Sequence, residues 1–362
     1  MTRLGVALFF STCLAVFVAI PSPTFAHKLN PKLIERITSE KIDEHIEATT
    51  TDPRGEERTF ARFPEWYIVY SAEEYADFVA DGGRPSQFPY FKAIGQYWDS
   101  VEYSTEALGD SEIDSSTDTV LKFIGASFTF ENAVIGGYEK TIGFLSEALN
   151  FFKESGADKY INSVSEEYAE FLMHTPWYDF PYFEKLPRLW SSVISDLSIR
   201  GLERRIIFTI GYTIKGLYGK VIGKVSHSSL GFAELEATFT TDNISETSLS
   251  AIPNVKIIEA YDDRHIHASA PRYRAFKPVA EAIVSAGGSF LDIQENSEIM
   301  LTVITSTDST CIKDRDDTIF SMPILTQPNT SRFAIKTPVQ DLHRVIKDLE
   351  SCKFPLEHIY DY

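Results

Sequence analysis

The spacing of hydrophobic and polar positions changes once along the chain, near residue 230. Before this point large apolar residues recur every three to four positions, as in SAEEYADF at residues 71–78, and this spacing is typical of amphipathic helices. Beyond residue 253, short apolar runs such as GSFLDI and EIMLTVIT are typical of strands. We therefore predict an α+β protein in which an all-α domain precedes a domain of mixed structure.

Three sequence blocks occur twice, in the same order, within the helical part. FTFENAVIGGYEKTIG, from Phe128, returns from Phe208 as FTIGYTIKGLYGKVIG with seven identical positions. SAEEYADF returns as VSEEYAEF, and FPYF returns unchanged. A tandem duplication explains this order. We predict a helical domain over residues 63–228 that is built from two repeats, about 63–150 and 155–228.

Glycines lie on one face of each copy of the longest block, with Gly136 and Gly143 in the first and Gly216, Gly219 and Gly223 in the second. An interior glycine costs a helix about 1 kcal/mol relative to alanine, so such a stripe indicates the close approach of another group. We expect this helix to pack the two repeats together about a pseudo-twofold axis. The alternative is that the glycines admit a bulky tyrosine or phenylalanine from a neighbouring helix.

After a polar connector at 229–252, the elements of residues 253–362 follow the order β-α-β-β-α-β. The helical segments YRAFKPVAEAIVSAGG and TPVQDLHRVIKDLESC alternate with extended segments, of which PLEHIYDY is the last. This order is typical of a ferredoxin-like domain. One further extended segment, SRFAIKT, is a strand that this fold does not need.

The N-terminal residues have the layout of a secretory signal peptide, with a basic Arg3, an apolar run, prolines and a small-residue site before Ala26. We predict that residues 1–26 are cleaved and that 27–62 form an arm. The protein would then be exported, periplasmic or secreted, and it would be membrane-anchored if the segment stayed uncleaved. Cys311 and Cys352 would remain, and in an oxidising compartment we expect them to form a disulfide.

Composition limits the classes of function. The formal net charge is −18, and no cluster of basic residues offsets it, so we expect no nucleic-acid partner. The common catalytic and phosphate-binding motifs are missing, and we expect no cofactor. An enzyme that uses a metal or acts on a small molecule stays an alternative, with a site between the repeats where Glu74 or Glu167 would meet Tyr138 or Tyr218.

The segments PEWYIVYSAEEYADF and FPYFKAIGQYW, together with the terminal EHIYDY, resemble a group of uncharacterised bacterial exported or membrane-associated proteins. The resemblance covers most of the mature chain. That group has no assigned activity, so the resemblance implies no function.

Histidines offer one candidate metal site. His265 and His267 alternate along one predicted strand, and His358 lies in the last strand, which a ferredoxin-like sheet places beside the first. Three imidazoles on adjacent strands could hold zinc or copper. The alternative is three separate histidines on an acidic protein.

Aromatic and basic residues repeated between the two halves indicate a binding surface, because Tyr and Trp are favoured where one side is apolar and the other wet. We expect an unknown protein partner, and as a second possibility a peripheral membrane contact through the basic helix RRIIFTIGYTIKGLYGKVIGK. Its cations do not gather on one face, which instead favours pairing with acidic neighbours. The candidate surface residues are Tyr75, Trp98, Tyr138, Lys140, Tyr168, Trp190, Tyr218 and Lys220.

Overall fold

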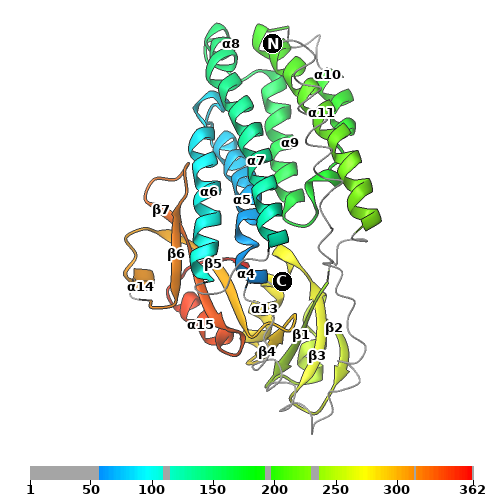
Figure 1. Cartoon of the computed structure of the whole chain (residues 1–362), viewed down its shortest axis with the longest axis vertical. Coiled ribbons are helices and arrows are strands. Elements are labelled where there is room, and N and C mark those ends of the chain that lie inside the picture. Colours follow the sequence, from blue (N-terminus) through cyan, green and yellow to red (C-terminus); the bar gives the residue numbers. More distant parts are fainter. Residues whose placement is uncertain (1–56, 109–114, 192–196, 230–235, 314, 361–362) are drawn as a thin grey trace.

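A helix bundle stands on two small antiparallel sheets in this α+β protein (Figure 1). The structure is a computed structural model that describes residues 57–108, 115–191, 197–229, 236–313 and 315–360. The predicted signal peptide and most of the predicted N-terminal arm lie outside these residues. None of the described helices is both long and apolar enough to cross a membrane.

The two predicted repeats contain the same elements in the same order. After the short α4 (Glu57–Phe60), the first repeat consists of α5 (Phe63–Ala80), η2 (Pro85–Gln87), α6 (Tyr90–Ala107) and α7 (Ser115–Tyr138). A π-helical turn, η3 (Glu139–Gly143), and α8 (Phe144–Leu149) follow. The second repeat consists of α9 (Gly156–Leu172), η4 (Trp177–Asp179), α10 (Tyr182–Ser191) and α11 (Ile199–Ser229).

Equivalent side chains make equivalent contacts in the two repeats. Trp98 Nε1 donates to Thr129 Oγ1 at 3.0 Å, and Trp190 Nε1 donates to Thr209 Oγ1 at 2.9 Å. The first aromatic ring of each FPYF block also packs edge-on against the tyrosine of the preceding helix: the Tyr75–Phe88 and Tyr168–Phe180 centroids are 5.1 and 5.0 Å apart. The repeated sequence blocks are therefore the contact sets that hold each unit together.

The most extensive packing between the repeats is that of α5 on α9. The glycine-bearing helices α7 and α11 meet through side chains such as Glu131 and Lys215 and not through their glycines, so the prediction that the glycines bring the repeats together is wrong. The glycines admit aromatic groups instead. A Cβ on Gly136 would lie 2.7 Å from the Cβ of Tyr90, and one on Gly216 would lie 2.6 Å from the ring of Phe183. The alternative considered for these glycines is confirmed for Gly136 and Gly216, because the groups they admit come from the two FPYF blocks. Gly143 instead faces the carboxylate of Glu139, and Gly219 faces the backbone of Tyr178.

The C-terminal part forms two four-stranded sheets. The first has the order β2-β3-β1-β4 and the second β6-β7-β5-β8, with antiparallel pairing throughout. The first set of elements is β1 (Glu236–Asp242), α12 (Glu246–Ser250), β2 (Lys256–Ala260), β3 (Ile266–Pro271), η6 (Tyr273–Ala275), α13 (Phe276–Ser285) and β4 (Ser289–Ile293). The second set is β5 (Glu298–Ser306), α14 (Thr310–Lys313), β6 (Thr318–Pro323), β7 (Thr330–Pro338), η7 (Val339–Asp341), α15 (Leu342–Ser351) and β8 (Leu356–Ile359).

These two sheets share one topology, which indicates a second internal duplication. In each sheet a glutamate that begins one strand lies opposite a proline that ends its partner: Glu236 faces Pro271, and Glu298 faces Pro338. The single ferredoxin-like sheet is not confirmed. Two strands account for the difference, because β1 lies in the segment assigned to a connector and the apparently superfluous SRFAIKT forms the inner strand β7.

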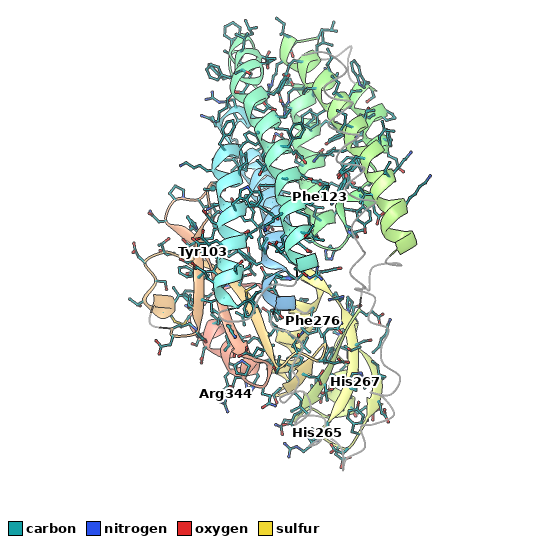
Figure 2. The ribbon with its side chains drawn as sticks, viewed as in Figure 1. Tyr103, Phe123, His265, His267, Phe276 and Arg344 are labelled. Carbon is teal, nitrogen blue, oxygen red and sulfur yellow. A yellow bond between two sulfur atoms is a disulfide. The ribbon has the colours of Figure 1, made fainter. Side chains whose placement is uncertain are left out.

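One hydrophobic core lies between the two sheets and the helices α13 and α15. A second core joins α4, α5 and α6 to the second sheet. There the rings of Phe63 and Phe320 are 4.6 Å apart, and the hydroxyls of Tyr70 and Tyr360 are 3.0 Å apart. Figure 2 shows Tyr103 near the sheet end of α6, where it stacks on Phe320. These contacts fix one end of the bundle on the second sheet.

The predicted disulfide is confirmed. Cys311 of α14 and Cys352, directly after α15, form a bridge with Cα atoms 6.4 Å apart. This separation lies within the range of about 4.4–6.8 Å usual for disulfides. The bridge ties the loop between β5 and β6 to the helix that covers the second sheet.

Candidate functional site

Helix α11 has its arginines turned inward and its aliphatic side chains turned outward. Arg200, Arg204 and Arg205 are at most 1% exposed. The outward side chains are spaced by three or four positions over about 33 Å of helix axis. They are Ile199, Leu202, Ile206, Ile210, Ile214, Leu217 and Val221. This arrangement is the reverse of an ordinary surface helix, in which apolar residues face the core.

Two of the buried arginines, Arg200 and Arg204, pair with carboxylates of α11 itself and of neighbouring helical segments. Arg200 Nη2 lies 3.0 Å from Asp158 of α9, and its Nη1 lies 3.1 Å from Glu203. Arg204 Nη1 lies 2.5 Å from Glu139, and its Nε lies 3.1 Å from Asp158. Burial acts to lower the pKa of Arg204, but the nearby acidic groups, Glu139 above all, outweigh it and raise the pKa. These ion pairs confirm that cations of this helix pair with acidic neighbours inside the bundle.

Exposed apolar side chains extend from α11 onto α7 and α8. We call this surface the apolar face. It consists of Phe130, Val134, Ile135, Ile142, Phe144, Leu145, Leu149, Phe151, Phe152, Leu197 and the seven outward residues of α11. Among the described residues, the large apolar side chains exposed elsewhere are Phe91, Trp98 and Ile258. Many exposed apolar side chains gathered on neighbouring helices mark an interaction site.

Charges around the apolar face favour an anionic partner although the chain is acidic. Two carboxylates of the α7–α8 segment, Glu139 and Glu147, are buried, and a third, Glu131, pairs with Lys215. By contrast, Lys140, Lys220 and Lys224 are exposed. These three lysines therefore add positive charge at this surface, where two of the carboxylates are buried and the third is paired.

A cavity of ≈ 390 Å³ lies between α7 and α11, with α5 and α9 behind it. Its apolar lining includes Ile68, Val134, Ile135, Ile207, Ile210 and Ile214. Six tyrosines also line it: Tyr75, Tyr90, Tyr138, Tyr168, Tyr182 and Tyr212. Four of the aliphatic lining residues belong to the apolar face, so the cavity opens onto that face.

The charged groups that line the cavity are already paired. Lys215 Nζ of α11 lies 2.5 Å from Glu131 of α7, and this ion pair joins the two helices. Burial acts to lower the pKa of Lys215, but Glu131 outweighs it and raises the pKa. Glu139 pairs with Arg204, and the Tyr138 hydroxyl donates to Glu203. These contacts leave the cavity with paired charges and a largely apolar wall.

Three of the eight candidate surface residues, Tyr75, Tyr138 and Tyr168, line the cavity. The other five lie outside its lining. Trp98 and Trp190 bond to threonines within their own repeats, and Lys140 donates to the Ser86 carbonyl. Tyr218 stacks on Trp177, and the ammonium of Lys220 lies over the ring of Phe183.

The three candidate metal-binding histidines are not brought together. His358 is in the second sheet, where β8 pairs with β5, whereas His265 and His267 belong to the first sheet and lie at its end far from the bundle (Figure 2). The ring of His358 packs at a tilt against Trp66 with centroids 3.8 Å apart, and burial lowers the pKa of His358 to about 3. Among the described residues no group of three or more His, Cys, Asp or Glu could hold a metal ion.

The glutamates of the alternative enzyme site do not converge either. Glu74 lies 3.7 Å from Arg332 of β7, at the junction with the second sheet. Glu167, its equivalent in the second repeat, pairs with Lys185 and is half exposed. Neither residue lines the cavity.

Two features of this site were missed by sequence reasoning: the cavity and the outward stripe on α11. A signal for the stripe is present, because Leu202, Ile206 and Ile210 recur at helical spacing out of phase with Arg200 and Arg204. The sequence does not say which of the two faces is buried. No comparable signal exists for the cavity, because it depends on the separation of two helices.

Comparisons with known proteins do not assign the chain to a family. The sequence matches no protein-family model, and no curated protein or solved structure shows significant similarity to it. Any function must therefore be inferred from the chain itself.

Proposed function

We propose that this is an exported, non-enzymatic binding protein whose apolar face attaches to an anionic lipid surface. The observation that carries the proposal is the reversed polarity of α11, with arginines in the bundle interior and aliphatic side chains outside. Charged residues that face a bundle interior while apolar residues face outward are the arrangement adopted next to lipid. The disulfide is compatible with the oxidising compartment that export implies.

The burial of apolar side chains should contribute more free energy to lipid binding than the attraction of the lysines to anionic headgroups. The seven outward side chains of α11 are about half exposed, so their complete burial is worth roughly 1 kcal/mol each, or about 7 kcal/mol together. Lys140, Lys220 and Lys224 would add about 1 kcal/mol each next to anionic lipid. We therefore expect binding that salt weakens but does not abolish.

A lipid surface fits the apolar face better than the protein partner expected from the sequence. The outward stripe of α11 lies along the helix axis, as in helices that rest in a membrane interface with one face buried. Exposed lysines beside it match anionic headgroups, in a chain whose net charge of −18 would otherwise be repelled. A protein partner is the competing explanation of the apolar face, and the experiment below distinguishes it from lipid attachment.

The test is co-sedimentation of the chain from residue 27 onward with vesicles of phosphatidylglycerol and phosphatidylcholine. The substitutions Leu202→Ser, Ile206→Ser and Leu217→Ser together remove outward apolar groups that do not line the cavity. We expect this triple variant to lose most of its binding. The control, Phe91→Ser with Ile258→Ser, removes exposed apolar groups outside the apolar face and should bind like wild type.

Two results would contradict the proposal. One is the absence of wild-type binding to anionic vesicles at low salt, which would leave a protein partner as the explanation of the apolar face. The other is a triple variant that binds as tightly as wild type. Lys220→Gln with Lys224→Gln tests the charge contribution: it should weaken binding at low salt and make the remaining binding less sensitive to salt.

A further inference from the structure

The cavity between α7 and α11 has the size of a small-molecule site. Its ≈ 390 Å³ falls within the range of about 300–1,000 Å³ that is usual for ligand pockets. Val134 and Ile135 of α7 and Ile210 and Ile214 of α11 line the cavity and are also exposed on the apolar face. A ligand can therefore enter from that face.

Both repeats contribute equivalent residues to the lining. Tyr75 corresponds to Tyr168, Phe88 to Phe180 and Val134 to Ile214, and all six line the cavity. The equivalence is incomplete, since Glu131 of α7 corresponds to Gly211 of α11 and Ile135 of α7 corresponds to Lys215 of α11. The Nζ of that lysine lies 2.5 Å from the carboxylate of Glu131, with which it forms an ion pair. No charge in the described lining is thus available for a charged ligand, so the part of a ligand that lies inside is uncharged.

We propose that this cavity holds a single acyl chain of a lipid, with the polar head of the lipid outside, beside the ion pair of Lys215 and Glu131. The choice of a lipid as the source rests on the proposed attachment of the apolar face to a lipid surface. An apolar cavity binds water poorly and apolar molecules well. A chain fits better than a compact ring because the opening runs between two helices that lie antiparallel, with Glu131 beside Lys215 and Glu139 beside Arg204.

Gly211 gives a direct way to fill the cavity. It lines the cavity from α11, and a Cβ added there would meet no atom within 4 Å. Gly211→Leu therefore places a side chain in open space, and it also removes a helix-interior glycine, which favours the helix. Gly95→Leu is the matched control, because Gly95 is likewise in a helix with open space around its Cβ but does not line the cavity.

The experiment titrates the full chain and both variants with cis-parinaric acid, whose fluorescence rises in an apolar site, and then displaces the probe with palmitate. We expect saturable binding by wild type and by Gly95→Leu. Because the leucine takes space that several methylene groups would fill, Gly211→Leu should bind at least about tenfold more weakly. Thermal unfolding should show that Gly211→Leu is folded.

Three outcomes would overturn the inference: no saturable binding by wild type, unchanged binding by Gly211→Leu, or displacement by 1-aminoanthracene but not by palmitate. Vesicle co-sedimentation of the same samples keeps the two proposals apart. Gly211→Leu should still sediment with vesicles, because its outward side chains are unchanged. Vesicle binding without probe binding would reject the acyl-chain site alone, and probe binding without vesicle binding would reject the surface attachment alone.

Discussion

Arg332 is the residue that links the bundle to the second sheet. Its Nε and Nη2 lie 2.6 and 2.7 Å from the two carboxylate oxygens of Glu357, and its guanidinium carbon lies 3.8 Å from the ring centroid of Tyr70. Glu74 approaches the same guanidinium at 3.7 Å as a second carboxylate. Burial and the charge of Glu357 outweigh the attraction of Arg332 and raise the pKa of Glu74 to about 7.

This raised pKa predicts a stability that falls as pH rises. Below about pH 4.5 Glu74 is protonated in both the folded and the unfolded chain, so it does not lower the free energy of unfolding there. Between that pH and about 7 the unfolded chain ionises first, and above pH 7 the folded chain is less stable by roughly 3 kcal/mol.

Glu74→Gln should therefore have little effect on the melting temperature at pH 4 and should raise it at pH 8, as measured by circular dichroism. Glu167→Gln, the equivalent position in the second repeat, is the control, because that carboxylate is half exposed. An equal shift for Glu74→Gln at both pH values would refute the prediction.

Arg204 gives a second test at a single residue. Its removal leaves Glu139 buried without its cation and leaves Asp158 paired with Arg200 alone, and the loss of a partner from a buried ion pair costs about 3–5 kcal/mol. Arg204→Met should lower the free energy of unfolding by that amount in urea titrations. Lys220→Met, on an exposed position of the same helix, should change it little. A loss for Arg204→Met no larger than for Lys220→Met would mean that the buried pairs contribute nothing.

At the scale of elements, the sequence predicted the helices and strands better than their arrangement. The repeated blocks identified the duplicated helical units because local contacts, such as those of FPYF with the preceding tyrosine, leave a local pattern. The second duplication was missed because β1 and β7 were assigned to a connector and to a superfluous strand. Strand pairing depends on residues far apart in the chain, so spacing alone does not show it.

The disulfide makes a prediction about α14 and α15. It closes a loop between residues 41 positions apart, and the chain-entropy relation assigns about 4 kcal/mol to such a bridge. Cys311→Ser with Cys352→Ser should lower the free energy of unfolding by about this amount. Added reductant should destabilise wild type and leave the double variant unchanged. Equal effects of reductant on the two proteins would contradict the prediction.

At the scale of the whole molecule, our proposal assigns different roles to the sheet region and to the helix bundle. The sheets and their helices form a conventional apolar core, and the second sheet fixes one end of the bundle. The bundle itself has paired charges inside and the apolar face outside. Of this site, the sequence predicted three tyrosines of the cavity lining, and it could not predict which face of α11 is exposed.

The most direct test of attachment through the apolar face is to measure whether position 206 enters lipid when vesicles are present. Ile206→Cys is labelled with a nitroxide, and its collisions with oxygen and with a water-soluble nickel complex are measured by electron paramagnetic resonance, with and without anionic vesicles. Ile258→Cys on β2 is the control in the sheet region. We predict that vesicles raise the oxygen accessibility and lower the nickel accessibility at position 206 only. Unchanged accessibility at position 206 in the presence of vesicles would contradict attachment through this face.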